Sequence, residues 1–389
     1  MRGKRMSTKG TVPGIVIAAS LAILLFGAVA QAAEPIKIGA ILSVTGPASF
    51  LGAPEAKTLE MLVAETNKKG GVLGHKIELI VKDSGASPEK AFSFAKQLID
   101  EDKVFAIIGP STSGETMKIK GVAEAGKTIL LSCAAAEAIV NPVATWVFKT
   151  PQKDSDAVIK IFQEMKKMKI SRIGVLSGND GFGNAGKGQI EKLAPKYGIT
   201  IAANEVYDAK ASDLTAEVTK IKAANVQAII NWSVVPAQAI VIKNARQIGI
   251  KVPIFQSHGF GNIKYVQAAG PAAEGVMFPA GRLLVADVLP KSNPQKALLV
   301  KYAKDYTDHY KEQPSTFGGH AYDAYTILLK AIEQAKSTDK EAVRTAIEHL
   351  HGFVGTGGIF NFSPADHNGL NVDAFEMLTV KNGKFAVLK

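Results

Sequence analysis

The feature of this 389-residue sequence that most limits its possible folds is an alternation of short β-branched runs with amphipathic helical patterns, which occurs twice. In the first series the strand-like runs are Ile36–Leu42, Lys76–Lys82, Val104–Ile108 and Thr128–Leu131. In the second they are Arg172–Leu176, Ile199–Val206, Ala228–Ile230 and Pro253–Gln256. Such alternation is typical of parallel sheets built from βαβ units. We therefore predict an α/β protein with two units of similar size.

The C-terminal third departs from this pattern. Helical patterns cover Asn293–Tyr310, Phe317–Lys336 and Asp339–His349, and residues 358–389 read as short strands with turns at Asn368-Gly369 and Asn382-Gly383. This segment could complete either sheet. The length exceeds what one core usually supports, and no flexible linker separates the two units. We expect several short crossings between them, which favour a hinge.

The first 33 residues have the pattern of a secretory signal peptide. Four basic residues (Arg2, Lys4, Arg5 and Lys9) precede the apolar run Ile15–Val29, and small residues end at Ala33. The alternative is an uncleaved membrane anchor, but the apolar run is short for a membrane span. We predict cleavage after Ala32 or Ala33 and a soluble protein in the periplasm.

Composition excludes several classes of site. Cys133 is the only cysteine, so an internal disulfide or a multi-cysteine metal site is impossible, and no His-Glu-x-x-His element is present. The net charge is +11, and it falls to +7 without the four basic residues of the leader. The remaining lysines are dispersed along amphipathic stretches. We therefore predict no nucleic-acid partner, no metal and no cofactor.

A glycine-rich segment offers the main enzymatic alternative. Gly181, Gly183 and Gly186 follow a predicted strand in a Gly-x-Gly-x-x-Gly pattern, with Glu205 near the end of the next strand. This pattern is similar to a dinucleotide-binding loop of an NAD(P)-dependent enzyme. The glycines begin several residues after the strand, however, whereas that loop requires a tight turn at the strand end. A glycine-rich turn at the edge of a cleft is the other interpretation.

Two loops at predicted strand ends favour an anion-binding site. Thr112 and Glu115 fit a capping box, which would place Ser113 and Gly114 at the positive end of a helix. The small residues Ala134, Ala135 and Ala136 follow the next strand, where they would let a ligand approach the backbone. Ligands of open α/β sheets bind at the carboxyl ends of strands. Trp232 and His258 follow strands of the second unit, so we expect them at the same cleft.

At this point the sequence resembles the Leu/Ile/Val-binding family of type I periplasmic solute-binding proteins, which serve ABC importers. The resemblance extends from about Ile36 to Lys389 and rests on the order and spacing of several segments. These are Ile36–Gly39 with Thr45-Gly46-Pro47, Asn67–Gly74, Ile107–Pro110 with Ser113, Ala134–Ala136, and Ala273–Val276.

The resemblance implies two doubly wound parallel-sheet lobes with a cleft between them, joined by crossings near Lys153, Pro279 and Thr356. Lobe one would comprise 34–153 and 280–356, and lobe two 154–279 and 357–389. Ser113 would bind a ligand carboxylate, with Ala134 and Ala136 at adjacent contact positions. The expected protein is a monomer, is not an enzyme, closes on a small carboxylate and delivers it to an ABC permease in the inner membrane. A sensory ligand-binding protein is the further alternative.

Two departures from the family pattern concern the ligand. His258 stands where amino-acid-binding members carry a Glu that pairs with the ligand ammonium, and Leu51, next to Phe50, replaces a polar aromatic residue. With Phe182 and Trp232 available to cover a ring, an aromatic acid without an α-ammonium is one candidate ligand. The other is an amino acid whose ammonium pairs with Asp180 or Asp208.

Overall fold

The computed structural model describes residues 1–11 and 33–389. It divides into two units, Met1–Ala32 and Ala33–Lys389. Residues 1–11 are exposed and form no helix or strand. The predicted apolar run and most of the predicted cleavage region lie outside the described residues. Within the described part of the chain, no helix combines the length and apolar character that a membrane span requires.

The first sheet has five parallel strands in the order β2-β1-β3-β4-β5. The strands are β1 (Ile36–Leu42), β2 (Ile77–Asp83), β3 (Ala106–Ile108), β4 (Ile129–Ser132) and β5 (Val147–Lys149). Its helices are α1 (Ser49–Lys68), α2 (Pro88–Asp100), α3 (Ser113–Ala125), α10 (Thr316–Ala335) and α11 (Lys340–Glu348). We call this sheet with its helices lobe one.

Helices cover both faces of the first sheet because successive strand residues point to opposite sides. Ile38 and Ala40 pack in one core with α1, α10 and α11. Ile41 and Ile107 pack in another with α2 and α3. Strands that are buried on both faces explain the nearly continuous apolar runs in the sequence.

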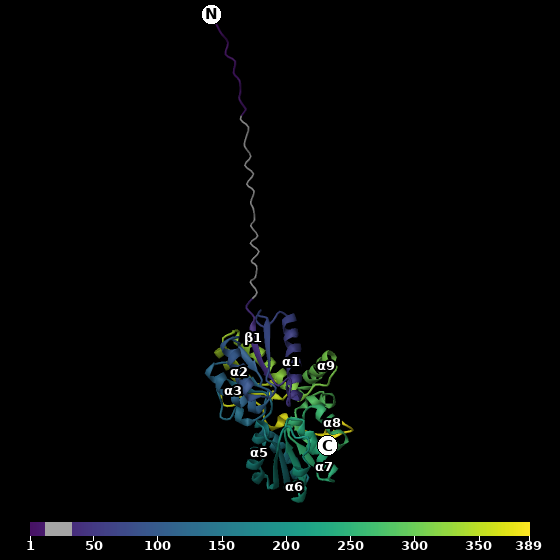
Figure 1. Cartoon of the computed structure of the whole chain (residues 1–389). Coiled ribbons are helices and arrows are strands. Elements are labelled where there is room, and N and C mark those ends of the chain that lie inside the picture. Colours follow the sequence, from purple (N-terminus) through teal and green to yellow (C-terminus); the bar gives the residue numbers. More distant parts are fainter. Residues whose placement is uncertain (12–32) are drawn as a thin grey trace. The chain divides into compact units, whose positions relative to one another are not determined.

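The second sheet has seven strands in the order β14-β13-β10-β9-β8-β6-β7. Strands β6 (Arg172–Gly178), β7 (Thr200–Tyr207), β8 (Ala228–Trp232), β9 (Ile254–Gln256) and β10 (Met277–Ala280) are parallel. The hairpin of β13 (Glu376–Lys381) and β14 (Lys384–Val387) adds an antiparallel edge. Helices α4 (Asp154–Lys167), α5 (Gly181–Leu193), α6 (Thr215–Ala223), α7 (Ala237–Gln247) and α8 (Ile263–Ala269) accompany this sheet. This is lobe two, and Figure 1 shows α5 to α8 grouped apart from α1, α2 and α3.

Two smaller elements complete the chain. Helix α9 (Lys296–Tyr310) packs on a short 3-10 helical segment, Arg282–Val288, through a separate apolar cluster. Strands β11 (Phe353–Val354) and β12 (Ile359–Phe360) form a two-stranded antiparallel sheet.

Three passages of the chain connect the lobes. The first two follow β5 and β10, close to the predicted positions near Lys153 and Pro279. For the third, predicted near Thr356, the packing favours a later position, because Phe360, Phe362 and Ala374 pack in the core of lobe one. We therefore propose that residues 357–374 belong with lobe one rather than with lobe two.

The predicted fold class, two doubly wound α/β lobes, is confirmed. One local prediction needs correction, and two strands were missed. Helix α1 begins at Ser49 instead of near Pro54, so the proline lies inside the helix, near its N-terminal end. The missed strands are β5 and β10, which have three and four residues. The turn at Asn382-Gly383 is confirmed, since it joins β13 to β14.

A pair of glycines in α5 tests the packing of lobe two. A methyl group at Gly186 would overlap the indole of the fully buried Trp232, whereas one at the exposed Gly188 would meet nothing within 4 Å. We expect Gly186→Ala to lower the free energy of unfolding by about 1–3 kcal/mol. Gly188→Ala, the matched control, should raise it by up to about 1 kcal/mol. Equilibrium denaturation measures both, and equal stability of the two variants would contradict this packing.

Candidate functional site

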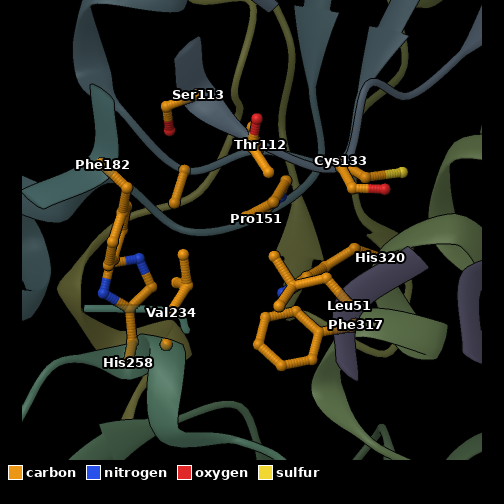
Figure 2. Close-up of a pocket in the computed structure, with 14 residues that line it drawn as sticks. Leu51, Thr112, Ser113, Cys133, Pro151, Phe182, Val234, His258, Phe317 and His320 are labelled. Carbon is orange, nitrogen blue, oxygen red and sulfur yellow. The ribbon is translucent and has the colours of Figure 1, made fainter. Parts of the chain in front are cut away.

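The carboxyl ends of parallel strands from both sheets meet at a narrow cavity (Figure 2). The lining residues of lobe one are Leu51, Ser111, Thr112, Ser113, Cys133, Ala134, Ala135, Pro151, Phe317 and His320. Those of lobe two are Phe182, Val234, His258 and Gly259. The cavity therefore has walls from two separately built sheets, and a ligand within it would contact both lobes.

The N-terminus of α3 forms one wall. Thr112 caps the helix, as predicted, and its hydroxyl accepts a hydrogen bond from the Glu115 N–H at 3.4 Å. The predicted capping box is incomplete, because the Glu115 carboxylate accepts hydrogen bonds from the hydroxyls of Thr112 and Ser43 instead of from the Thr112 N–H. The Ser113 Oγ accepts a hydrogen bond from the Ala136 N–H at 3.2 Å. The hydroxyl proton of Ser113 is thus available to an anion beside a positive helix end.

A buried acid lies behind this wall. The Ser111 hydroxyl donates to Glu55, and the Ser43 N–H donates to Ser111 Oγ at 3.0 Å. Burial raises the pKa of Glu55 to about 8. At neutral pH this carboxyl is therefore protonated and adds no negative charge behind the helix end.

A buried lysine supports the opposite loop. Lys149 Nζ donates to the carbonyl oxygens of Ala135, Pro151 and Gln152 at 2.9, 2.8 and 3.2 Å. Three acceptors match the three protons of an ammonium group. Burial lowers the pKa of Lys149, while the nearby Asp154 carboxylate opposes that shift. The same ammonium holds the 134–136 loop and the first passage between the lobes.

Two histidines contribute polar groups from opposite lobes. His258 begins the short 3-10 helix His258–Phe260 after β9, and His320 lies in the first half of α10. Burial and, to a smaller extent, the Lys149 charge lower the pKa of His258 well below its usual range. The same two causes lower the pKa of His320 to about 3. Both imidazoles are therefore neutral at physiological pH.

The rest of the lining is largely apolar. Leu51, Phe182, Val234 and Phe317 surround the space between Ser113 and His320 (Figure 2). Among the described lining residues there is no Asp or Glu. Asp180 caps α5 through the Phe182 and Gly183 N–H groups, and Asp208 is exposed. Neither acid lines the cavity.

Six of the ten predicted site residues line the cavity: Leu51, Ser113, Ala134, Ala135, Phe182 and His258. Four do not, and each has a different role in the structure. Trp232 is fully buried behind Phe182 and His258, with ring centroids 5.7 and 5.6 Å away. Ala136 contributes its N–H to Ser113.

The other two lie where the lobes approach each other. Gly114 faces Gly181 of lobe two, where an added Cβ on Gly181 would lie 2.7 Å from the Gly114 backbone. Phe50 packs on Tyr265, and its carbonyl oxygen accepts from Asn262 Nδ2 at 2.9 Å. These contacts link the two lobes outside the cavity.

The sequence analysis did not select eight lining residues: Ser111, Thr112, Cys133, Pro151, Val234, Gly259, Phe317 and His320. Five of them lie within two positions of a selected residue, so a wider window around each loop would have found them. Pro151, Phe317 and His320 have no such signal, because Pro151 lies on the first passage between the lobes and α10 follows no strand of either sheet. Cys133 is buried, and burial raises the pKa of its thiol well above the usual range.

The glycine-rich segment has a packing explanation. An added Cβ would approach the Gly114 backbone at Gly181, the Gly178 carbonyl at Gly183, and the Trp232 ring at Gly186. Each glycine of the pattern is thus required by a close approach within the protein. The segment forms the first turn and a half of α5, beginning three residues after β6. It contributes Phe182 to the cavity wall.

Comparison with known proteins agrees with this geometry. A family model described as periplasmic binding protein matches residues 35–384. The leucine-, isoleucine-, valine-, threonine- and alanine-binding protein of Pseudomonas aeruginosa is 28% identical over 344 residues, covering 87% of this chain and 89% of that protein. The substrate-binding protein LivJ of Streptococcus pneumoniae, solved with isoleucine, is 26% identical with a TM-score of 0.80, covering 91% of this chain and 99% of that one.

A more distant structure shares the fold alone. A solute-binding protein of an ABC transporter from Rhodopseudomonas palustris, solved with 3,4-dihydroxybenzoic acid, is 17% identical with a TM-score of 0.79. It covers 91% of this chain and 96% of that one. Since the family model spans most of the sequence and the two-lobed fold agrees with it, the chain belongs to the periplasmic binding protein family.

Proposed function

We propose that this protein captures a small carboxylic acid between its two lobes in the periplasm and delivers it to an ABC permease of the inner membrane. It acts by binding and not by catalysis. A ligand that contacts both lobes stabilises the closed arrangement through contacts that the open one lacks. Membership of the family supports this general role, and the basic, apolar and small-residue pattern of residues 1–33 supports export.

The wall at the N-terminus of α3 is the proposed carboxylate site. The Ser113 hydroxyl has its proton free, the helix end carries partial positive charge, and the protonated Glu55 adds no repulsion. The Lys149 side chain donates to the Ala135 carbonyl on the adjoining loop. Burial lowers the pKa of Lys149 to about 7, so the group adds positive charge near the cavity in its protonated form. These groups together favour an anion at this end.

The observation that decides the ligand class is the absence of Asp and Glu from the described cavity lining. A buried ammonium without a partner costs several kcal/mol. Two of the proteins named above, from Pseudomonas aeruginosa and Streptococcus pneumoniae, are described with α-amino acid ligands. This chain would differ from them at the position of the ligand ammonium, where His258 stands. The apolar lining, with Phe182 and Phe317, suits a ring. We therefore propose an aromatic carboxylic acid that lacks an α-ammonium as the ligand.

A substitution at Ser113 tests the carboxylate site. Ser113→Ala removes a hydroxyl donor to a charged group, which is typically worth about 1.5–3 kcal/mol. We expect affinity for the acid to fall roughly 10- to 100-fold. The melting temperature of the unliganded protein should also fall, because the Ala136 N–H loses its acceptor. Ser87→Ala is the control, because Ser87 caps α2 away from the cavity and should leave affinity unchanged. If the Ser113 variant binds the acid with unchanged affinity, Ser113 does not bind the carboxylate, and its only role is to accept the hydrogen bond from the Ala136 N–H.

A matched pair of ligands tests the ammonium end. Phenylalanine and 3-phenylpropanoate differ only by the α-ammonium group, so the difference in their affinities reports its cost. We expect 3-phenylpropanoate to bind at least 100-fold more tightly, since each factor of ten corresponds to about 1.4 kcal/mol. Calorimetry with leucine, valine and benzoate extends the comparison. Submicromolar binding of leucine or valine, with no binding of the acids, would contradict the proposed ligand class and indicate an amino-acid-binding protein.

A further inference from the structure

His258 is a buried polar side chain in the cavity wall, and it has no hydrogen-bond partner among the described residues. It is 7% exposed, and both of its ring nitrogens lack a hydrogen bond. Phe182, Trp232 and Phe375 meet the imidazole edge-on at centroid distances of 5.3, 5.6 and 5.6 Å. Buried polar groups are normally paired, and each one left without a partner is costly. A ligand in the cavity is the group best placed to pair with this imidazole.

His258 lies on the side of the cavity that contains the proposed carboxylate site. The first turns of α3 and α5 meet there, since a Cβ added to Gly181 would lie 2.7 Å from the Gly114 backbone and 3.4 Å from the Ser113 carbonyl carbon. Phe182, the next residue of α5, packs on the His258 ring. Figure 2 shows Ser113, Phe182 and His258 on one side of the cavity. A ligand whose carboxylate contacts the Ser113 hydroxyl therefore brings the carbon atom next to that carboxylate toward His258.

The opposite side of the cavity suits the apolar part of such a ligand. Leu51 and Phe317 lie there, together with His320 (Figure 2). Since His320 is on that side, His258 is the imidazole that adjoins the carboxylate site. The polar group that pairs with His258 therefore belongs close to the ligand carboxylate and not at the far end of the ligand.

The protonation state of His258 limits what that group can be. The imidazole is neutral, so it presents one N–H donor and one acceptor nitrogen. An ammonium group could donate to the acceptor nitrogen, but its charge would have no carboxylate partner in the described lining and would be opposed by the Lys149 charge. An oxo or hydroxyl oxygen is uncharged and accepts a hydrogen bond from the N–H.

We propose that the ligand carries an oxygen atom on the carbon next to its carboxylate, as an oxo or a hydroxyl group, and that this oxygen accepts a hydrogen bond from the His258 imidazole. The ligand class is then the 2-oxo and 2-hydroxy acids with an aromatic side chain. Ser113 of lobe one and His258 of lobe two bind neighbouring groups of one ligand, which helps to hold the lobes together. This inference rests on the proposed carboxylate site and deepens the proposed function.

Four ligands that differ only at the second carbon test this inference on the unmodified protein. They are 3-phenylpropanoate, phenylpyruvate with an oxo group, and the two enantiomers of 3-phenyllactate with a hydroxyl group. Calorimetry should show that phenylpyruvate or one phenyllactate binds at least about tenfold more tightly than 3-phenylpropanoate. The acid that binds most tightly decides between the oxo and the hydroxyl group.

Variants of His258 assign this preference to the imidazole. In His258→Leu, which removes the N–H donor, the ratio of the affinity for the preferred acid to that for 3-phenylpropanoate should fall toward one. His258→Gln keeps an N–H donor and should retain part of the preference. His349→Leu makes the histidine-to-leucine change at an exposed position and should leave the ratio as it was.

The outcomes separate this inference from the proposed carboxylate site. If 3-phenylpropanoate binds as tightly as the acids with an oxygen at the second carbon, the inference is wrong while the carboxylate site stands. If His258→Leu keeps the full preference, the assignment to His258 is wrong. If none of the four acids binds, the inference and the proposed function are both wrong.

Discussion

The hydrogen bonds of Lys149 are the interaction on which the candidate site most depends. One buried ammonium is shared among the carbonyl oxygens of Ala135, Pro151 and Gln152. The first of these belongs to the loop that borders the cavity, and the other two belong to the first passage between the lobes. Asn368 Nδ2 donates to the carbonyl oxygens of Lys149 and Pro151, which adds a segment from the C-terminal part of the chain. The Lys149 side chain therefore positions both the 134–136 loop and the first passage between the lobes.

The same charge shapes the polarity of the cavity. It helps to keep His258 and His320 neutral, and it lies near the end where α3 presents its own partial positive charge. The part of the cavity beside α3 is thus suited to an anion, and the parts beside the two histidines to neutral groups. Selectivity among ligands then depends on the absence of a carboxylate partner for an ammonium as much as on the groups that bind the ligand. An unpaired buried charge costs more free energy than one hydrogen bond contributes.

The sequence predicts the parts of this structure that depend on local pattern. Alternating runs identified most strands, and Thr112 marked the start of α3, because these signals come from residues close together in the chain. Strand-end position placed Ser113, Ala134 and His258 at the cavity, since parallel strands end at one edge of a sheet.

The errors concern contacts between distant segments. Trp232 is the last residue of β8 instead of following the strand, and its indole lies in the core because Gly186 of α5 leaves room for it. His320 lies on a helix more than sixty residues beyond His258, and only the packing of α10 on lobe one brings it to the cavity. The later third passage that we propose has a similar basis, since Phe360 and Phe362 join a core that contains many residues from early in the chain.

A crystal structure of the mature protein with bound 3-phenylpropanoate tests the central claim most directly, because the claim concerns the orientation of a ligand between two lobes. The account predicts that the carboxylate contacts the Ser113 hydroxyl at the N-terminus of α3 and that the ring packs against the apolar lining, which includes Phe182 and Phe317. A carboxylate that does not contact Ser113, or a ligand bound outside this cavity, would contradict it.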